Sequence, residues 1–186
     1  SAITFAFILV FAITTFAFGG YSVPTDGEWY NISWHYRIRV EANVSVVNST
    51  NWPMELQLNF SDLLPEGTFD NSSVRVVEYN VSGKVKNEIP SQFDRGDSYN
   101  NATNAVGEVI FILNGTTSAN TKRIFYIYFD AVENGAKQPR VYPSNLTYSW
   151  GGQIAKINSS RLRMEIDTNR GENVSGIYYV DEKNSG

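Results

Sequence analysis

A strict alternation of apolar and polar side chains between Ile32 and Val46 limits this stretch to one kind of structure. Every second residue is apolar, and the residues between are Ser, His, Arg, Glu or Asn. Successive side chains point to opposite faces of a β-strand, so a period of two gathers the apolar ones on one face. We therefore predict a long half-buried strand here, or two strands joined by a bend. The apolar positions are Ile32, Trp34, Tyr36, Ile38, Val40, Ala42, Val44 and Val46.

Other segments carry strand patterns as well. The same alternation returns over 54–60, 146–150 and 162–166. Segments 73–79 (SVRVVEY), 108–114 (EVIFILN) and 123–129 (RIFYIYF) are rich in β-branched and aromatic residues, which predicts more fully buried strands. Stretches with Gly, Pro, Asn and Asp separate these segments, and no stretch has a convincing helical period.

Many short strands separated by turns, without alternating helices, predict an all-β fold. We expect an antiparallel β-sandwich, jelly-roll or Ig-like, with an open-ended barrel as the alternative. The sandwich is assigned to residues 21–155. Residues 156–186 are expected to form an extra hairpin or the start of a further domain.

The first twenty residues, SAITFAFILVFAITTFAFGG, are uncharged and almost entirely apolar. Such a run is a secretory signal peptide, a retained membrane anchor or the stem of a pilin-like filament subunit. Small residues at Ala17 and Gly19 favour cleavage after Gly19. If uncleaved, residues 1–20 would contact the membrane. Each interpretation places the rest of the chain outside the cytoplasm, so an extracellular or cell-surface location is expected.

Charge and cysteine content exclude several function classes. The net charge is −4, and the 15 Lys and Arg residues are scattered among 19 acids, so no nucleic-acid partner is expected. Because cysteine is absent, the chain has no disulfide, no thiolate metal site and no cysteine nucleophile.

The chain is unusually rich in N-x-S/T triplets, the acceptor signal for N-linked glycans. With 19 Asn and 30 Ser plus Thr in 186 residues, random placement gives about three, whereas eleven occur. Turn chemistry offers another explanation for three of them, Asn71, Asn101 and Asn114. The acceptors are Asn31, Asn43, Asn48, Asn59, Asn71, Asn80, Asn101, Asn114, Asn145, Asn158 and Asn173.

Three of the acceptors fall within segments that have a strand pattern. Asn43, Asn59 and Asn145 each occupy a polar position of the alternation. A sugar attached there would point into water rather than into the core. Strand pattern and acceptor position are therefore mutually consistent.

Few residues are candidates for catalysis or metal binding. His35, the one histidine, is expected to face solvent on a strand, and we predict no catalytic residues. Asp94 and Asp97 beside a glycine turn are weak candidates for Ca²⁺, the sole cofactor considered.

The positions of the tryptophans in these patterns predict their surroundings. Trp29 and Trp52 lie in turn-like contexts and are the better candidates for stacking against a sugar ring. Trp34 and Trp150 are assigned to the core because they occupy apolar positions of the alternation.

The segments WHYRIRVEANV, WPMELQLNFSDLL, SVRVVEYN, IPSQFD, GEVIFIL and TKRIFYIYFD follow one another over residues 29–131. This order resembles β-sandwich modules near the N-termini of large secreted or surface-anchored proteins, particularly archaeal ones. Such modules open with a W-x-Y-R strand, matched by Trp34, Tyr36 and Arg37. They close with an aromatic-rich strand, matched by Tyr126, Tyr128 and Phe129. The resemblance implies an extracellular structural or ligand-binding module and supplies no catalytic residues.

Three functions remain open on the sequence alone. The first is a non-catalytic, N-glycosylated module of a cell-surface or secreted protein, with a role in envelope structure or adhesion. The second is a carbohydrate-binding or accessory domain of a polysaccharide-active enzyme. The third is a pilin-like filament subunit. The expected partners are covalent N-glycans, polysaccharide and neighbouring envelope subunits.

Overall fold

The strand β1 (Tyr36–Asn43) confirms the central part of the alternating segment. Its residues Ile38, Val40 and Ala42 are buried, and those between them are half-buried. The strand begins later than predicted, because residues 32 and 33 form a turn, and Ile32 is 83% exposed. Val44 lies outside the residues that the structure describes.

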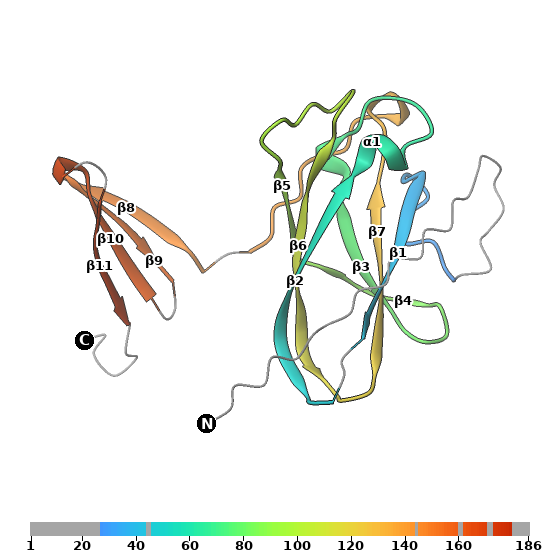
Figure 1. The fold of residues 1–186 in the computed structure, drawn as a ribbon, viewed down its shortest axis with the longest axis horizontal. Coiled ribbons are helices and arrows are strands. Elements are labelled where there is room, and N and C mark those ends of the chain that lie inside the picture. Colours follow the sequence, from blue (N-terminus) through green and yellow to red (C-terminus); the bar gives the residue numbers. More distant parts are fainter. Residues whose placement is uncertain (1–26, 44–45, 144, 160–161, 171–172, 180–186) are drawn as a thin grey trace. The chain divides into compact units, whose positions relative to one another are not determined.

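The computed structural model describes residues 27–43, 46–143, 145–159, 162–170 and 173–179. They divide into two compact units, the first ending at Arg140 and the second beginning at Val141 (Figure 1). The apolar segment 1–20 lies outside the described residues. Within the described part of the chain, no helix is long and apolar enough to cross a membrane.

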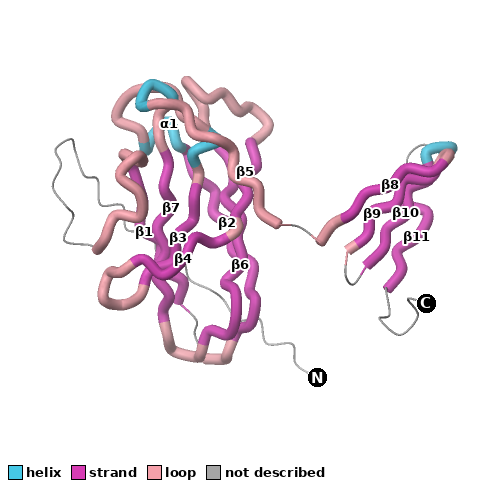
Figure 2. Tube along the Cα trace, turned by 180° about the vertical axis from the view of Figure 1, so that it is seen from behind, coloured by secondary structure: helices cyan, strands magenta, loops and turns pink. Residues whose placement is uncertain are grey.

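The first unit is a two-layer antiparallel β-sandwich (Figures 1 and 2). One sheet has the order β1-β7-β3-β4, and the other has the order β2-β6-β5. The strands after β1 are β2 (Ser49–Asn59), β3 (Arg75–Tyr79), β4 (Val85–Ile89), β5 (Ser91–Arg95), β6 (Val106–Thr117) and β7 (Lys122–Phe129). The helical turns are α1 (Phe60–Leu63), η1 (Asn71–Ser73) and η2 (Val132–Asn134).

The core between the two sheets is built from the inward residues of both. In the first sheet Val40 lies opposite Phe125, and Ile38 lies opposite Ile127. In the second sheet Met54 lies opposite Phe111. All of these residues belong to one buried cluster. The cluster also includes Phe60 and Phe69, whose stacked rings have centroids 4.2 Å apart. The predicted sandwich is therefore confirmed.

The central strands of the sheet β1-β7-β3-β4, β3 and β7, are buried on its outer face as well. Every residue of β3 is buried, as is β7 from Phe125 onward. The outer residues Val77, Tyr79, Tyr126 and Tyr128 form a second buried cluster, against which the segment before β1 packs through Trp29, Tyr30 and Trp34. The prediction of fully buried strands is confirmed for β3 and for this part of β7.

The strand β6 differs from this prediction, because its burial alternates. Val109, Phe111 and Leu113 are buried, while Ile112 is 49% exposed. The other face of β6 carries exposed side chains, among them Glu108 and Ile112, and Ile110 between them is half-buried. Pro53, which has no N–H to donate, is accommodated on β2 because β2 is an edge strand.

The second unit is one antiparallel sheet with the order β11-β10-β9-β8. Its elements are β8 (Thr147–Gly151), β9 (Ile154–Asn158), β10 (Leu162–Asp167), η3 (Thr168–Arg170) and β11 (Asn173–Tyr179). The sequence predicts a sandwich that extends to residue 155. The structure divides the chain between Arg140 and Val141, so that β8 and β9 belong to the second unit.

The two faces of β6 provide a test of the sandwich. We expect Phe111→Ala to lower the free energy of unfolding by about 3–5 kcal/mol, because it leaves a cavity between the sheets. The neighbouring Ile112→Ala is expected to cost about 1 kcal/mol or less, since that side chain is half exposed. Urea unfolding measures both, and equal losses would contradict the assignment of the two faces.

Candidate functional site

The structure places most of the acceptor asparagines at the surface. Six are exposed and four are half-buried, and the side chain of Asn173, on β11, lies outside the described residues. The half-buried ones are Asn43, Asn59, Asn71 and Asn158. The exposed ones are Asn31, Asn48, Asn80, Asn101, Asn114 and Asn145.

Two exposed acceptors adopt the same local geometry, in which the side-chain carbonyl closes a turn. Asn31 Oδ1 accepts the backbone N–H of Ser33 at 2.9 Å, and Asn80 Oδ1 accepts that of Ser82 at 3.0 Å. Asn80 Oδ1 also accepts the N–H of Lys84 at 2.9 Å. These bonds use the oxygen of the amide and fix the side chain. The amide nitrogen, where a glycan attaches, makes no hydrogen bond among the described residues.

Asn59 is placed differently from the prediction. It ends β2 and caps α1, where its Oδ1 accepts the N–H of Ser61 at 3.2 Å. Its Nδ2 donates to Asp62 Oδ2 at 2.7 Å, and the residue is half-buried. The pattern of alternation ends at a helix cap here, so the side chain does not project freely into water. The amide nitrogen of Asn59, where a glycan would attach, is therefore already hydrogen-bonded to a carboxylate.

Asn43 and Asn145 agree better with their predicted orientations. Asn43 occupies the face of β1 opposite Ala42, and Asn145 is exposed just before β8. Asn48 is exposed, and its Oδ1 accepts the N–H of Ala119 at 2.9 Å, which joins the loop before β2 to the loop after β6. No sequence signal indicated this contact.

The three acceptors with a turn-based explanation also differ from one another. Asn71 begins η1, where Asp70 is the cap, and Asn101 lies in a turn. Asn114 lies within β6 rather than in a turn, on its exposed side. Turn chemistry therefore does not account for Asn114.

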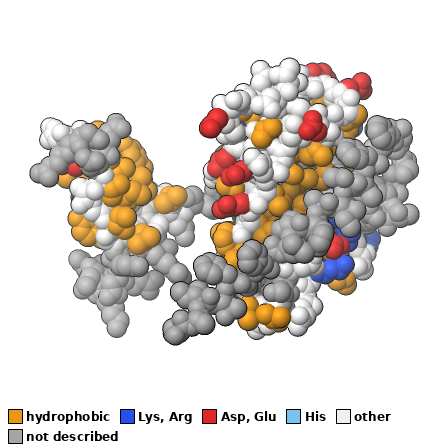
Figure 3. All heavy atoms as spheres, in the orientation of Figure 1, with side chains coloured by type: hydrophobic (Ala, Val, Ile, Leu, Met, Phe, Trp, Pro, Cys, Tyr) orange, Lys and Arg blue, Asp and Glu red, His pale blue; other side chains and the backbone are white. Residues whose placement is uncertain are grey.

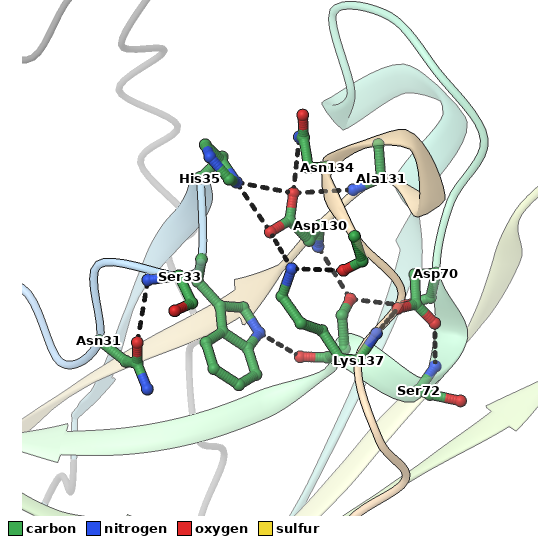
Figure 4. A network of polar contacts seen from close by, with 12 residues as sticks. Asn31, Ser33, His35, Asp70, Ser72, Asp130, Ala131, Asn134 and Lys137 are labelled. Carbon is green, nitrogen blue, oxygen red and sulfur yellow. Dashed lines mark hydrogen bonds and ion pairs between the residues drawn. The ribbon is translucent and has the colours of Figure 1, made fainter.

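A buried carboxylate, Asp130, organises the polar contacts after β7 (Figure 4). Its side chain is fully buried. His35 Nδ1 lies 2.9 Å from Oδ2, and Lys137 Nζ lies 2.9 Å from the same oxygen. Oδ1 accepts hydrogen bonds from Asn134 Nδ2 at 2.8 Å and from the backbone N–H of Ala131 at 2.9 Å. Both oxygens are therefore fully used.

The environment of Asp130 explains its ionisation. Burial opposes the charged form, but the hydrogen bonds from His35, Asn134 and Lys137 outweigh it and lower the pKa of Asp130. An ionised carboxylate only accepts hydrogen bonds, so His35 Nδ1 is the donor in this pair. The predicted solvent-facing histidine is thus half exposed and joined to an acid 95 residues away.

The same cluster brings together the residue types of a hydrolase triad without forming one. Ser73 is fully buried, and its Oγ donates to the backbone carbonyl of Asp70 at 2.5 Å. It also accepts the backbone N–H of Asp130 at 2.8 Å. A triad needs the serine hydroxyl bonded to the histidine and open to substrate. Here the hydroxyl belongs to a turn, so the cluster is suited to holding loops together.

A second polar cluster surrounds Arg37 on the outer face of the sheet. Arg37 Nη1 donates to the carbonyl of Glu28 and to Tyr128 Oη, both at 2.8 Å. Its guanidinium lies 4.1 Å from the ring centroid of Tyr126 and 4.4 Å from that of Trp29. The strands that carry Arg37 and Tyr128 are paired, as β1 and β7. Arg37 on β1 and Tyr128 on β7, 91 residues apart in the chain, are therefore in direct contact.

The two predicted stacking tryptophans have different surroundings. Trp29 is half-buried, with its Nε1 donating to the carbonyl of Trp34 at 2.9 Å and its ring packed edge-on against Tyr128. Trp52, on the edge strand β2, is 42% exposed. Only Trp52 of the pair presents an open ring.

The predicted core tryptophans also differ. Trp34 is half-buried in the outer cluster rather than between the sheets, and its Nε1 donates to the carbonyl of Ser73 at 2.6 Å. Trp150, on β8 of the second unit, is 57% exposed and so does not belong to a core.

The weak calcium candidates are not gathered into a site. Asp94, on β5, accepts a hydrogen bond from Gln92 Nε2 at 2.5 Å, and Asp97 is exposed in the following turn. Among the described residues, no group of three or more His, Asp or Glu side chains is arranged to hold a metal ion.

Comparison of the chain with protein-family models, curated proteins and solved structures gave no match.

The buried carboxylate predicts a pH dependence of stability. Because the pKa of Asp130 is lowered by folding, its contribution to stability is present above the pKa of the unfolded chain, about 4. It is lost as the pH falls through the lower folded-state pKa. We expect Asp130→Asn to cost about 3–5 kcal/mol at pH 7, since it leaves Lys137 buried without its charge partner.

Urea unfolding between pH 7 and pH 3 measures this effect. The difference in stability between the wild type and Asp130→Asn is expected to shrink as the pH falls below about 4. The pKa of Glu78 is lowered too, because hydrogen bonds from Arg123 and Lys86 outweigh its burial. Glu78 is present in both proteins, so the comparison isolates Asp130. A difference that stays constant down to pH 3 would contradict the assignment.

Proposed function

We propose that this chain is a non-catalytic, N-glycosylated β-sandwich module of a cell-surface or secreted protein, which serves envelope structure or adhesion. The observation that carries the proposal is the excess of acceptor triplets, eleven where about three occur by chance. N-linked glycans are added to chains that leave the cytoplasm. The apolar segment 1–20 supports an extracellular location. So does the resemblance of residues 29–131 to β-sandwich modules of secreted or surface-anchored proteins.

The positions of the acceptors are compatible with glycans on the folded module. A glycan is bulky and needs an open surface around its asparagine. Six acceptors are exposed, five of them in the first unit and Asn145 in the second. Five of them lie in loops or turns and Asn114 lies on β6, a distribution that suits a chain coated along its length.

The interior of the first unit supports a structural role. The buried acidic and basic residues are engaged in ion pairs or hydrogen bonds; they are Asp70, Arg75, Glu78 and Asp130. Buried charges with such partners hold loops and strands in place. Asp130, for example, accepts hydrogen bonds from Ala131 and Asn134 in the loop after β7. A rigid scaffold of this kind needs no disulfide, which agrees with the absence of cysteine.

Two acceptors with opposite surroundings test the proposal. In a host that performs N-glycosylation, we expect Asn80→Gln to remove one glycan from the secreted protein, because this exposed turn residue is accessible. Asn59→Gln is expected to leave the glycan mass unchanged, since its amide nitrogen is bonded to Asp62. It loses a helix cap and about 1 kcal/mol of stability instead.

Intact-mass measurement before and after enzymatic deglycosylation reads out both variants. Wild-type protein that is secreted but shows no mass change on deglycosylation would contradict the proposal. Loss of a glycan in Asn59→Gln would contradict only the structural selection between acceptors.

Polysaccharide binding is the second candidate function, because Trp52 presents an open ring on an edge strand. Aromatic rings of this kind stack against sugars. Retention of the wild type on a polysaccharide gel, with loss of retention in Trp52→Ala, would favour this role. Failure to bind a broad panel of glycans would count against it.

The filament alternative depends on residues 1–20, which lie outside the described residues. Mass spectrometry of the mature protein distinguishes it from the first proposal. A mature chain that begins near Gly20 would exclude the stem.

A further inference from the structure

The sheet of the second unit has one face made of apolar side chains. Strand register defines two rows that cross all of its strands on this face. The first row comprises Tyr148, Ile157, Met164 and Ile177. The second row comprises Trp150, Ala155, Ile166 and Val174. We call these two rows the apolar face.

The opposite face of the same sheet is polar. Lys156 and Arg163 each form an ion pair with Glu165, at 3.4 Å. Ser149, the neighbour of Tyr148 on β8, also lies on this side, opposite Lys156. The sheet is thus amphipathic, with the alternation expected of a sheet that is covered on one face only.

Four side chains of the apolar face are more than half exposed. Tyr148 and Ile177 are each 65% exposed, and Trp150 is 57% exposed. In Figure 3 the apolar side chains of the second unit gather on one side of it. Soluble monomers rarely expose continuous apolar patches of more than a few hundred Å². A single amphipathic sheet also requires a second layer to form a stable domain.

The covering layer must itself be apolar and free of charge, because no charged side chain lies on the apolar face. The solvent-facing side of β2-β6-β5 in the first unit does not meet this condition. It carries the exposed acids Glu55, Asp94 and Glu108, with Asp94 directly opposite Glu108. Burying these carboxylates against the apolar face would cost several kcal/mol each.

A second copy of the chain does meet the condition. Its apolar face is identical, so two copies related by a twofold axis bring only apolar side chains together. An aromatic side chain buries about 150–250 Å². The exposed parts of both apolar faces would therefore bury on the order of 1,200 Å² in total, the lower end of specific interfaces.

We propose that two copies of the chain pair through the apolar faces of their second units, as the two layers of a β-sandwich. The layers then lie about 10 Å apart, with their side chains interdigitated. Aliphatic residues outnumber aromatic ones on this face and no charged side chain lies on it, so it suits a sheet better than a sugar. The proposal does not rest on glycosylation.

Two neighbouring residues of β8 form a matched pair for the test. Tyr148→Glu places a charge in the proposed interface, and Ser149→Glu places the same charge on the polar face, opposite Lys156. Sedimentation velocity of the full chain over a concentration series is expected to show a dimer for the wild type and for Ser149→Glu. Tyr148→Glu is expected to weaken dimerisation about 30-fold or more.

A cross-link provides a readout that does not depend on a destabilising charge. The chain contains no cysteine, so Ile157→Cys introduces a single thiol at the middle of the first row. A bis-maleimide with a spacer of about 10 Å is expected to join two such chains, matching the distance between sheets. Ser149→Cys, on the polar face, is expected to remain uncrosslinked.

A wild-type chain that is monomeric at every concentration would overturn the proposal. A dimer that persists in Tyr148→Glu would also overturn it, because another surface or residues 1–20 would then hold the copies together. Binding of the wild-type monomer to polysaccharide, lost in Tyr148→Glu, would assign the face to sugar instead.

Discussion

The first unit depends on the burial of β3 and β7, the central strands of its sheet β1-β7-β3-β4, on both faces. The inner face meets the second sheet, as in any sandwich, but the outer face is covered by a segment without regular secondary structure, residues 27–35. Such a segment has few backbone bonds of its own, so specific side chains must hold it. Among these, Arg37 donates to the carbonyl of Glu28 and Asp130 accepts from the ring of His35.

Arg37 and Asp130 stabilise the segment through different interactions. Arg37 spreads one charge over the rings of Trp29 and Tyr126 and donates hydrogen bonds to the carbonyl of Glu28 and the hydroxyl of Tyr128. Contacts of a cation with aromatic faces gain strength where water is excluded. Asp130 is a single buried charge whose oxygens are saturated by four donors. Both arrangements fix the chain without any disulfide.

Sequence reasoning succeeded where a local period determines the structure and failed where contacts are distant. The alternation around Val40 and the apolar run of β7 predicted their burial correctly, because strand periodicity depends only on neighbours. Ile32 fits the same period but is exposed, since a turn intervenes before β1. The pairing of His35 with Asp130 joins residues far apart in the chain, and no pattern indicates it. Trp29 lies in a turn-like context, yet it packs because the outer face of β7 needs a cover.

The acceptor triplets also show that a local sequence pattern does not reveal contacts between side chains. Their number is a property of the sequence, but whether an asparagine is accessible depends on its partners, as the contrast between Asn80 and Asn59 shows. The central claim is that this scaffold carries glycans on its exposed loops. Glycopeptide mapping of the protein isolated from the cells that make it tests this claim most directly. The account predicts glycans on peptides that contain exposed acceptors such as Asn31 and Asn80; unmodified peptides at all eleven positions would contradict it.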